Sequence, residues 1–586
     1  MDKIKPQSGF VKQNEVLLQD NGEWLYFSNP HRIIATEKLE EILPALREVE
    51  RSIAANQWYA AGFLSYEASS AFDSALHALR QTGAGFSYLW FGLYPEPRIV
   101  KSPGPERPKQ ILEWHPTTDR ETYNAAISKI KNYITTGKTY QVNYTMRLYT
   151  DFIGSAWDFF LHLTQNQNNH AAYLDTGRYV ICSASPELFF QLDGNTITCR
   201  PMKGTTKRGR TTIEDNEQSE WLKNSEKNRA ENVMIVDLIR NDLGKIAEVG
   251  SVCVPHLFET ERYPTLWQMT STVTAKTNAS LTEIFTALFP CGSITGAPKI
   301  STMKIIAELE NTRRKIYTGT IGYISPQQKA SFNVAIRTLL INKEDQRAEY
   351  GIGGGIVWDS SSTDEYAEAL LKAQVLVQQP IPFSLLETIL WTQEEGFFLQ
   401  ERHIARMLDS ATYFDIPITK EKLEDYLEQI SSDFFTPQRV RVLLDPVGKL
   451  SYASRPFEIR EDNQTLKVCL AKAPVDSSNV FLFHKTTRRE VYETARKGFE
   501  EVDDVLLYNE LGELTEFTIG NLVVELNGQL LTPPISCGVL AGTFRAYLLE
   551  AGQVLERTIT VDQLNKCTKI FRVNSIRKWQ RVEIQE

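Results

Sequence analysis

The segment from Arg200 to Arg210 carries five cations and no acid. Its glycines allow the backbone to approach an anionic ligand closely. A lysine among other cations has its pKa pushed down, and lysine must lose its proton before it can act as a nucleophile. The segment therefore predicts Lys203 as a nucleophile in an anion-binding site, with a solvated basic loop as the alternative.

Acidic side chains on two predicted helices could hold a metal ion. Glu231 lies one turn ahead of an apolar run, and Glu365, Glu368 and Lys372 share one face of another helix. Two carboxylates from separate helices, completed by a substrate carboxylate and water, suit Mg²⁺, which takes few of its oxygen ligands from protein. A surface ion pair between Glu368 and Lys372 is the alternative.

Further segments are suited to binding carboxylates. The run Phe289–Lys299 is rich in small residues and leads into a helix, where backbone N–H groups can bind an anion. Arg337 falls in a predicted strand, Phe332–Ile341, and a buried strand arginine usually has an anionic partner. The run Gly351–Gly355 is not a dinucleotide-binding loop, because its spacing differs and a strand follows it.

The composition narrows the class of protein. The chain has 586 residues and a formal net charge of −9, which argues against a nucleic-acid partner. Its seven dispersed cysteines form no C-x-x-C pair, as expected in a reducing compartment. No stretch resembles a signal peptide or a membrane span. We therefore expect a cytoplasmic enzyme without a membrane partner.

Helical patterns position these groups. Predicted helices begin at the capping-box spacings Thr118–Glu121 and Ser362–Glu365. A long helix is predicted over Gln218–Leu243, with five residues buried: Val233, Ile235, Val236, Leu238 and Ile239. The stretch 378–382 contains two prolines and predicts a linker between a domain at 1–377 and a domain at 383–586. The second domain is predicted to contain strands at 387–391, 439–444 and 467–471, and a helix at 401–413.

The first domain resembles the chorismate-utilising enzymes over most of Thr118–Gln374. The motifs that carry this resemblance are Tyr140–Asn143, Ser185–Phe189, Arg229–Asp242, Gly292–Lys299, Arg337 and Gly353–Lys372. The resemblance implies an α+β fold, with two antiparallel sheets packed as a sandwich.

The resemblance also implies roles for single residues. Glu231 and Glu368 would be ligands of Mg²⁺, and Glu187 a general acid/base. Lys203 stands as in the aminodeoxychorismate type, where the lysine attacks ring C2 of chorismate, the C4 hydroxyl leaves, and ammonia enters at C4. Trp267 replaces a histidine that is tied to pyruvate elimination in the anthranilate branch. The expected contacts to the chorismate carboxylates are Gly204, Thr205, Tyr317, Arg337, Gly353, Gly354, Gly355 and Lys372.

The same resemblance bears on partners. No cysteine lies in the glycine-rich elbow of a glutaminase, so we expect ammonia from a separate glutamine amidotransferase subunit or from free ammonium. The segment Leu64–Glu67 lies where relatives bind tryptophan, which makes tryptophan a candidate structural or regulatory ligand of the first domain.

The second domain resembles the fold-type IV pyridoxal-phosphate enzymes over nearly all of Leu385–Asn574, which implies a smaller α+β domain. The motifs are His484–Arg488, Thr515–Leu522, Leu531–Pro534 and Gly538–Arg545. By this resemblance Lys485 forms the Schiff base with pyridoxal 5'-phosphate, and Glu516 pairs with the pyridinium nitrogen. Arg406, Asn521 and Thr543 would bind the phosphate region.

The fusion favours a lyase over an aminotransferase as the second activity. The product of the first domain, 4-amino-4-deoxychorismate, carries an amine that the cofactor can bind, and loss of pyruvate then gives 4-aminobenzoate. Two alternatives are an anthranilate-type synthase fused to an aminotransferase, and a degenerate second domain that serves as a scaffold for the amidotransferase.

Overall fold

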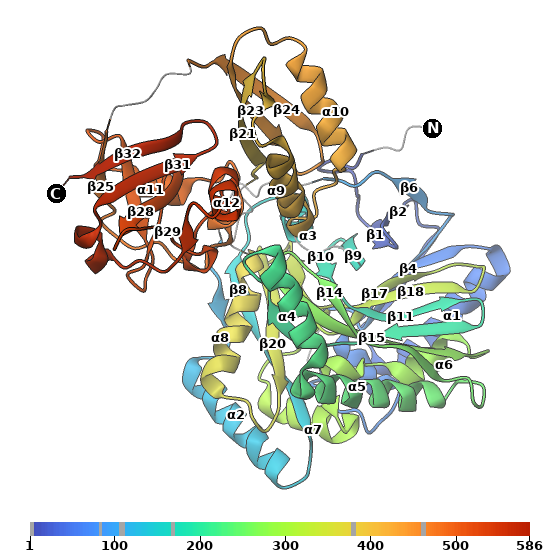
Figure 1. Cartoon of the computed structure of the whole chain (residues 1–586). Helices are drawn as coiled ribbons and strands as arrows, with labels where there is room; N and C mark the ends of the chain where they lie inside the picture. The colour runs from blue at the N-terminus through green and yellow to red at the C-terminus, as the bar shows by residue number, and fades with distance from the viewer. Residues whose placement is uncertain are drawn as a thin grey trace. The chain divides into compact units, whose positions relative to one another are not determined.

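The computed structural model describes residues 5–80, 85–104, 112–165, 170–376, 382–458 and 465–585. The chain divides into two compact units (Figure 1): unit 1 comprises residues 1–207 and 219–380, and unit 2 comprises residues 208–218 and 381–586. Unit 2 therefore includes a short segment from the N-terminal half of the chain. The linker predicted at 378–382 lies, apart from Pro382, outside the described residues, and the predicted domain boundary stays a prediction.

Unit 1 contains two ten-stranded sheets whose strand pairings are antiparallel. The first sheet runs in the order β16 (Gly296–Ala297), β8 (Gln141–Asp151), β20 (Arg347–Ile356), β19 (Thr338–Asn342), β10 (Tyr179–Ser185), β9 (His170–Asp175), β1 (Val16–Asp20), β2 (Glu23–Phe27) and β6 (Arg98–Val100), with β7 (His115–Pro116) beside β8. The second sheet runs in the order β13 (Met202–Lys207), β15 (Leu266–Lys276), β12 (Thr196–Arg200), β11 (Leu188–Asp193), β18 (Lys329–Val334), β17 (Thr320–Ile324), β4 (Tyr59–Leu64), β5 (Leu89–Tyr94) and β3 (Arg32–Thr36), with β14 (Cys253–Arg262) beside β15.

The two sheets pack face to face over an apolar core. Phe63 and Trp90 of the second sheet lie in one buried cluster with Leu18 and Ile181 of the first. Helices pack on the outer faces, and Figure 1 shows α2 and α8 beside β20. The helices of this unit are α1 (Ile42–Asn56), α2 (Arg120–Thr135), α3 (Ala156–Thr164), α5 (Glu226–Gly244), α6 (Leu281–Leu288), α7 (Lys299–Leu309) and α8 (Ser362–Lys372), while α4 (Thr212–Asn224) begins in unit 2. The predicted two-sheet sandwich is confirmed.

Unit 2 combines a four-stranded sheet with an eight-stranded sheet, as expected for a smaller α+β domain. The four-stranded sheet is β22 (Gly396–Phe397), β21 (Leu385–Thr392), β23 (Gln438–Leu444) and β24 (Leu450–Pro456), and α9 (Gln400–Tyr413) and α10 (Lys420–Ser431) share its apolar core. The other sheet is β27 (Leu514–Phe517), β26 (Asp504–Tyr508), β25 (Leu466–Leu470), β32 (Lys578–Ile584), β31 (Lys569–Asn574), β28 (Gly520–Leu526), β29 (Gln529–Thr532) and β30 (Leu555–Glu556). Because β27 also pairs with β28, six of these strands close into a small barrel, which α11 (Glu490–Arg496) and α12 (Thr543–Glu550) accompany.

Several local predictions are wrong for identifiable reasons. The strand predicted over 332–341 is two strands, β18 and β19, because Arg337 takes a φ of +49° between them. The helix predicted over 218–243 is divided between α4 and α5, because Ser225 adopts extended backbone and accepts a hydrogen bond from the N–H of Asn228. Val233, expected to be buried, is 38% exposed. The first predicted helix is capped by Asp119 and not by the preceding threonine.

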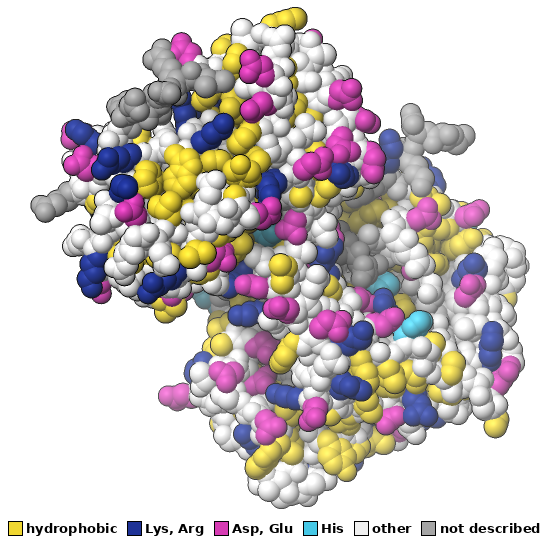
Figure 2. Space-filling model, viewed as in Figure 1, with side chains coloured by type: hydrophobic (Ala, Val, Ile, Leu, Met, Phe, Trp, Pro, Cys, Tyr) yellow, Lys and Arg dark blue, Asp and Glu magenta, His cyan; other side chains and the backbone are white. Residues whose placement is uncertain are grey.

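The surface shows no segregation of charge on the face seen in Figure 2, where acidic and basic side chains are interspersed. Among the described residues, no helix combines the length and apolar character needed to cross a membrane.

Candidate active sites

Lys203 lies on β13, an edge strand of the second sheet in unit 1. The register between β13 and β15 shifts around Gly204, which has a φ of +96°. The carbonyl of Lys203 accepts a hydrogen bond from the side chain of Asn232 at 3.2 Å, and the carbonyl of Gly204 accepts one from Gln268 at 2.8 Å. These bonds fix the irregular backbone at the predicted nucleophile, and Thr205, two residues after Lys203, is exposed.

The ammonium group of Lys203 lies among charged side chains from three other segments of unit 1: α5, α8 and the turn between β10 and β11. Burial lowers the pKa of Lys203, and Lys372 lowers it further, whereas Glu231, Glu187 and Glu368 act in the opposite direction. The structure therefore brings these five predicted site residues together. Burial, and not the basic segment around residue 203, is the main cause of the lowered pKa.

The two predicted metal ligands come from separate helices, Glu231 from α5 and Glu368 from α8. The ion pair given as the alternative for Glu368 is present, since the Nζ atom of Lys372 lies 2.8 Å from Glu368 and also donates to the carbonyl of Gly353 at 3.0 Å. No cluster of three or more potential metal-ligating side chains occurs in the described part of the chain. Two carboxylates fit Mg²⁺, which leaves most of its coordination shell to water and substrate.

Glu187 lies between β10 and β11 and is 3% exposed. The hydroxyl of Ser293, in a 3-10 turn at Gly292–Ile294, donates to the Oε1 atom of Glu187 at 2.5 Å. Burial raises the pKa of Glu187 to about 7, although the bond from Ser293 and the charge of Lys203 both oppose the rise. A carboxyl group with this pKa can both donate and accept a proton near neutral pH.

The glycine run of β20 lines the same region, and residues 351, 353 and 355 share one face of the strand. A Cβ atom on Gly355 would lie 2.0 Å from the Nε2 atom of Gln141 and 2.8 Å from the Nζ atom of Lys203. A Cβ atom on Gly351 would lie 2.2 Å from the ring of Tyr317. Tyr317 and Lys203 therefore lie along one face of β20, where glycine is needed at both positions.

Arg337 occupies the turn between β18 and β19. Burial lowers the pKa of its guanidinium group, which interacts electrostatically with Tyr350 and Tyr263. No hydrogen bond or ion pair of this guanidinium group is formed with any residue that the structure describes. Arg337 is half-buried, and a partly desolvated cation without a counter-charge is costly, so the site is suited to an anion.

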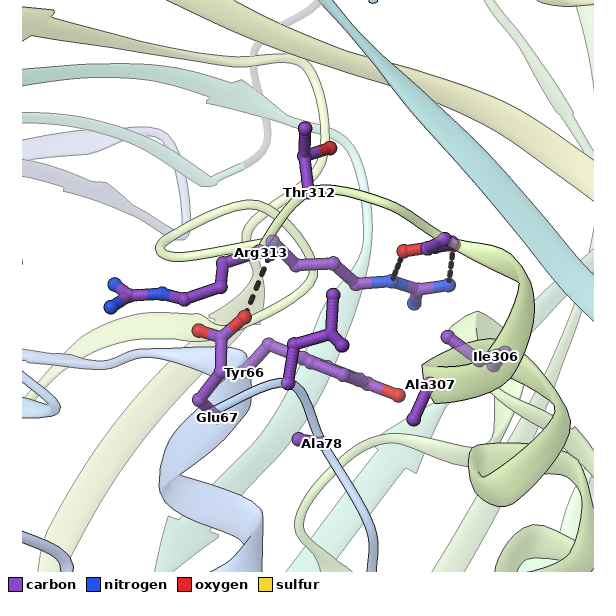
Figure 3. A pocket seen from close by; sticks show the side chains of 10 residues that line it. Tyr66, Glu67, Ala78, Ile306, Ala307, Thr312 and Arg313 are labelled. Atoms are coloured by element: carbon purple, nitrogen blue, oxygen red, sulfur yellow. Dashed lines mark hydrogen bonds and ion pairs between the residues drawn. The ribbon is translucent and has the colours of Figure 1, made fainter. Parts of the chain in front are cut away.

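The segment predicted to bind tryptophan lies beside a small cavity (Figure 3) lined by Tyr66, Glu67 and Arg313. Glu67 accepts a hydrogen bond from the backbone N–H of Arg314 at 2.7 Å and others from the N–H of Lys315. The cavity has room for about one water molecule, so tryptophan does not fit in it. Tryptophan binding in unit 1 stays a prediction.

In unit 2, Lys485 lies outside the helices and strands. Its carbonyl accepts a hydrogen bond from the N–H of Leu386 on β21 at 2.8 Å, which fixes its backbone to that strand. Burial lowers the pKa of Lys485 to about 8, and Arg406 and Arg489 lower it further, while Glu387 and Glu516 oppose them. Lys485 is therefore neutral more often than an exposed lysine. An amine must be neutral before it can form a Schiff base with a carbonyl group.

Glu516 on β27 is 3% exposed and receives two hydrogen bonds. The hydroxyl of Tyr492 donates to its Oε1 atom at 2.8 Å, and the side chain of Asn521 donates to its Oε2 atom at 3.0 Å. Burial raises the pKa of Glu516 to about 7. A buried carboxyl group held in this way fits a partner with a protonatable ring nitrogen, as pyridoxal phosphate has.

Arg406 on α9 forms a two-point contact with Glu387, at 2.8 and 2.6 Å, and donates to the carbonyl of Ala541 at 3.0 Å. His403, one turn earlier, bonds to Glu387 through Nδ1 at 2.6 Å and lies 3.2 Å from the hydroxyl of Thr543 through Nε2. Thr543 begins α12, whose N-terminal N–H groups suit a phosphate. The predicted cofactor-binding residues thus lie around one part of unit 2.

Sequence reasoning missed several members of both sites. Ser293 and Gln141 stand inside motifs that the resemblance used, but neither was assigned a role. Glu387 carries a visible signal, because it is an acid within the apolar run Leu385–Trp391 and is 3% exposed. The spacing of His403 and Arg406, one helical turn apart, would have shown that both can meet this carboxylate.

Two family models match successive parts of the chain. Residues 7–378 match the family model of the chorismate binding enzymes, and residues 384–584 match that of the class IV amino-transferases. Component I of anthranilate synthase from Streptococcus pneumoniae TIGR4 is 25% identical, with a TM-score of 0.51, over 63% of this chain and 91% of that chain. The menaquinone-specific isochorismate synthase from Escherichia coli, 19% identical, has a TM-score of 0.50 over 63% of this chain and 90% of its own.

Curated relatives match the first part of the chain. Aminodeoxychorismate synthase component 1 from Escherichia coli (strain K12) is 41% identical over 271 residues, which are 46% of this chain and 59% of that protein. The chloroplastic aminodeoxychorismate synthase of Arabidopsis thaliana is 42% identical over 267 residues, 44% of this chain and 29% of that protein. The chain thus spans 59% or less of the length of these two relatives. The chain belongs to the chorismate binding enzyme family and carries a class IV aminotransferase domain after its chorismate-binding domain.

Proposed function

We propose that the chain makes 4-aminobenzoate from chorismate in two steps. Unit 1 would replace the C4 hydroxyl of chorismate with an amine, giving 4-amino-4-deoxychorismate, and unit 2 would eliminate pyruvate from that product. The observation that carries the proposal is the position of Lys203, a partly buried lysine with a lowered pKa that interacts with Glu187. The similarity to aminodeoxychorismate synthase components supports the first step.

In the first step the neutral amine of Lys203 attacks C2 of the ring, the double bond shifts, and the C4 hydroxyl leaves. Glu187 donates the proton with which that hydroxyl departs as water. Ammonia then attacks C4, the double bond shifts back, and the bond between C2 and Lys203 breaks. Arg337 and Tyr317 would hold carboxylates of the substrate, and Glu231 and Glu368 would hold Mg²⁺, which supplies a positive charge that orients the ring carboxylate.

In the second step Lys485 holds the cofactor and moves the proton at C4 of the aminated substrate. Pyridoxal phosphate, when bound, supplies an electron sink for the bond that loses this proton. Glu516 would keep the ring nitrogen protonated, and Arg406 and Thr543 would bind the phosphate region. Loss of the C4 proton and departure of the enolpyruvyl group, which becomes pyruvate, leave an aromatic ring.

Ammonia needs a source outside the residues discussed so far. The relatives named component 1 suggest by their names a second component, and we propose a separate glutamine amidotransferase subunit in that role. Free ammonium at high concentration would replace it in a purified system. The relation to anthranilate synthase leaves a second candidate, amination at C2, because one such component 1 from Aquifex aeolicus (strain VF5) is 36% identical over 276 residues.

Product analysis tests the proposal. Purified protein would receive chorismate, Mg²⁺, ammonium and pyridoxal phosphate, and the products would be separated and identified for wild type, Lys203→Ala, Lys485→Ala and Lys207→Ala. Lys207 is an exposed lysine on the same strand as Lys203 and serves as the matched control.

We expect 4-aminobenzoate and pyruvate from wild type and from Lys207→Ala. Lys485→Ala should stop at 4-amino-4-deoxychorismate, and Lys203→Ala should leave chorismate unchanged. Formation of 2-aminobenzoate would refute the role of Lys203, and a Lys485→Ala variant with wild-type products would refute the role of unit 2.

A further inference from the structure

We infer that residues 208–215 position Lys485 of the cofactor site by holding the residue before it, His484. The inference concerns how unit 2 is completed, and it rests on the proposed function of that unit. These residues belong to unit 2 although they follow β13 directly in the sequence.

The first part of this segment is fixed to the end of α9. The hydroxyl of Tyr413 donates to the carbonyl of Gly209 at 2.7 Å, and Arg208 donates to the carbonyl of Tyr413 at 3.0 Å. The guanidinium group of Arg208 lies over the ring of Tyr413 and is 2.7 Å from Asp215, with both side chains of this ion pair less than 10% exposed. A Cβ atom on Gly209 would lie 2.1 Å from the backbone nitrogen of Asp215, so the turn requires glycine.

The next residue, Arg210, contacts the side chain of the residue before the predicted catalytic lysine. The carbonyl of Arg210 lies 3.2 Å from the Nε2 atom of His484, while the Nδ1 atom lies 2.9 Å from the hydroxyl of Ser410. Because a carbonyl can only accept, Nε2 carries the hydrogen and Nδ1 accepts from Ser410. Burial lowers the pKa of His484 to about 4, which keeps the ring in this neutral form near neutral pH.

The side chain of Arg210 bonds to the segments on either side of this histidine. It donates to the carbonyl of Ser477 at 3.2 Å and to that of Ser536 at 3.3 Å, and it lies over the ring of Phe483. Glu214 holds the guanidinium group in place at 2.6 Å. Ser536 lies in the 3-10 turn Ile535–Cys537, which leads to the start of α12 in the predicted phosphate site.

Two of these contacts hold the rings of Phe483 and His484, the two residues before Lys485. The carbonyl of Lys485 accepts the N–H of Leu386, and the ring of its neighbour His484 is held from two sides. A lysine that must reach a carbonyl carbon needs its backbone fixed within a fraction of an ångström. The segment 208–215 therefore acts as a positioning element and touches no reacting atom in this arrangement.

The test compares full-length variants by their binding of pyridoxal phosphate. Arg210→Ala removes the bonds to both carbonyls, Arg210→Lys can restore a bond to one of them, and Tyr413→Phe removes one hydroxyl while keeping the ring. Arg402→Ala is the matched control, because Arg402 is also paired with a glutamate, Glu550, and is 30% exposed against 29% for Arg210.

The readouts are the affinity for pyridoxal phosphate and the visible circular dichroism of the bound cofactor, which reports its orientation. We expect Arg210→Ala to bind about tenfold more weakly than wild type with a diminished dichroic band. Tyr413→Phe should change in the same direction, Arg210→Lys should recover part of the loss, and Arg402→Ala should match wild type. Retained amination of chorismate checks that unit 1 of each variant is folded, and near-ultraviolet circular dichroism of the protein without cofactor checks the folding of unit 2.

If Arg210→Ala and Tyr413→Phe both match Arg402→Ala in affinity and dichroism, the positioning role is wrong, even where their thermal stability falls. A wild-type protein that binds no pyridoxal phosphate would overturn the proposed function of unit 2 and this inference together. If wild type binds pyridoxal phosphate normally and the variants bind it equally well, only the inference is overturned.

Discussion

Replacing Ser293 with alanine should move the pH dependence of chorismate amination toward higher pH. The hydroxyl of Ser293 donates to the buried carboxylate of Glu187 at 2.5 Å and lowers the pKa of that group, which burial raises to about 7. A hydrogen bond to a buried charge contributes about 1.5–3 kcal/mol, and about 1.4 kcal/mol corresponds to one pKa unit. Without the bond, the pKa of Glu187 should rise by about one to two units.

The direction of the expected pH shift follows from the proposed role of Glu187 as the acid that protonates the departing hydroxyl. Activity requires the protonated form, so it falls as pH rises through the pKa of Glu187, and a higher pKa moves this fall upward. The assay is kcat/KM for chorismate against pH, with wild type and variant measured at the same total ammonium so that its titration cancels in the ratio. Ser128→Ala, which removes an exposed helical hydroxyl, is the control.

A Ser293→Ala profile that falls at the same pH as wild type would refute the reasoning, and so would a shift toward lower pH. Either result would mean that a group other than Glu187 causes the fall of kcat/KM at high pH. Glu187→Gln adds a second check, because it should remove this fall and reduce the amination rate by about 10²–10⁴-fold, the usual contribution of a general acid.

Three further predictions concern single residues. Gly355→Ala places a methyl group 2.0 Å from Gln141 and 2.8 Å from Lys203, so amination should fall at least about tenfold while pyridoxal phosphate binding, measured by absorbance, stays unchanged. Glu368→Gln should raise the Mg²⁺ concentration needed for half-maximal amination by about tenfold or more, and a variant with the wild-type requirement would exclude this residue as a ligand. Glu516→Gln should leave amination intact but nearly abolish 4-aminobenzoate formation, which chromatography of the products measures directly.

Much of the fold follows from the sequence because its signals are local or carried by motifs. The helix predicted at 401–413 and the strand predicted at 439–444 match α9 and β23 within one residue, since both are strongly periodic and buried on one face. The break at Ser225 was missed because helical residues flank it on both sides, and only the capping bond to Asn228 ends the pattern. The turn at Arg337 was missed because a left-handed backbone conformation is uncommon at arginine and cannot be recognised from the residue types around it.

The candidate sites show a similar limit. Lys203 was found from a run of cations, yet its pKa is lowered mainly by burial, which depends on strands and helices far away in the sequence. The basic run itself divides between two units, since the residues up to Lys207 belong to unit 1 and those from Arg208 to unit 2. The contact of His484 with Arg210 joins positions that are distant in sequence, and no periodicity or spacing could have indicated it.

In both sites burial shifts the pKa of a lysine and of a glutamate, but the two glutamates are suited to opposite charge states. In each, burial lowers the pKa of a lysine and raises the pKa of a glutamate to about 7. A protonated ring nitrogen would place a positive charge beside Glu516, and this charge would favour the ionised form of its carboxyl group. In the proposed reaction the change beside Glu187 runs the other way. Lys203 would lose its charge before it attacks the ring, and that loss removes a charge which lowers the pKa of Glu187. Deprotonation of Lys203 would thus favour the protonated form of Glu187 at the moment when the departing hydroxyl needs a proton.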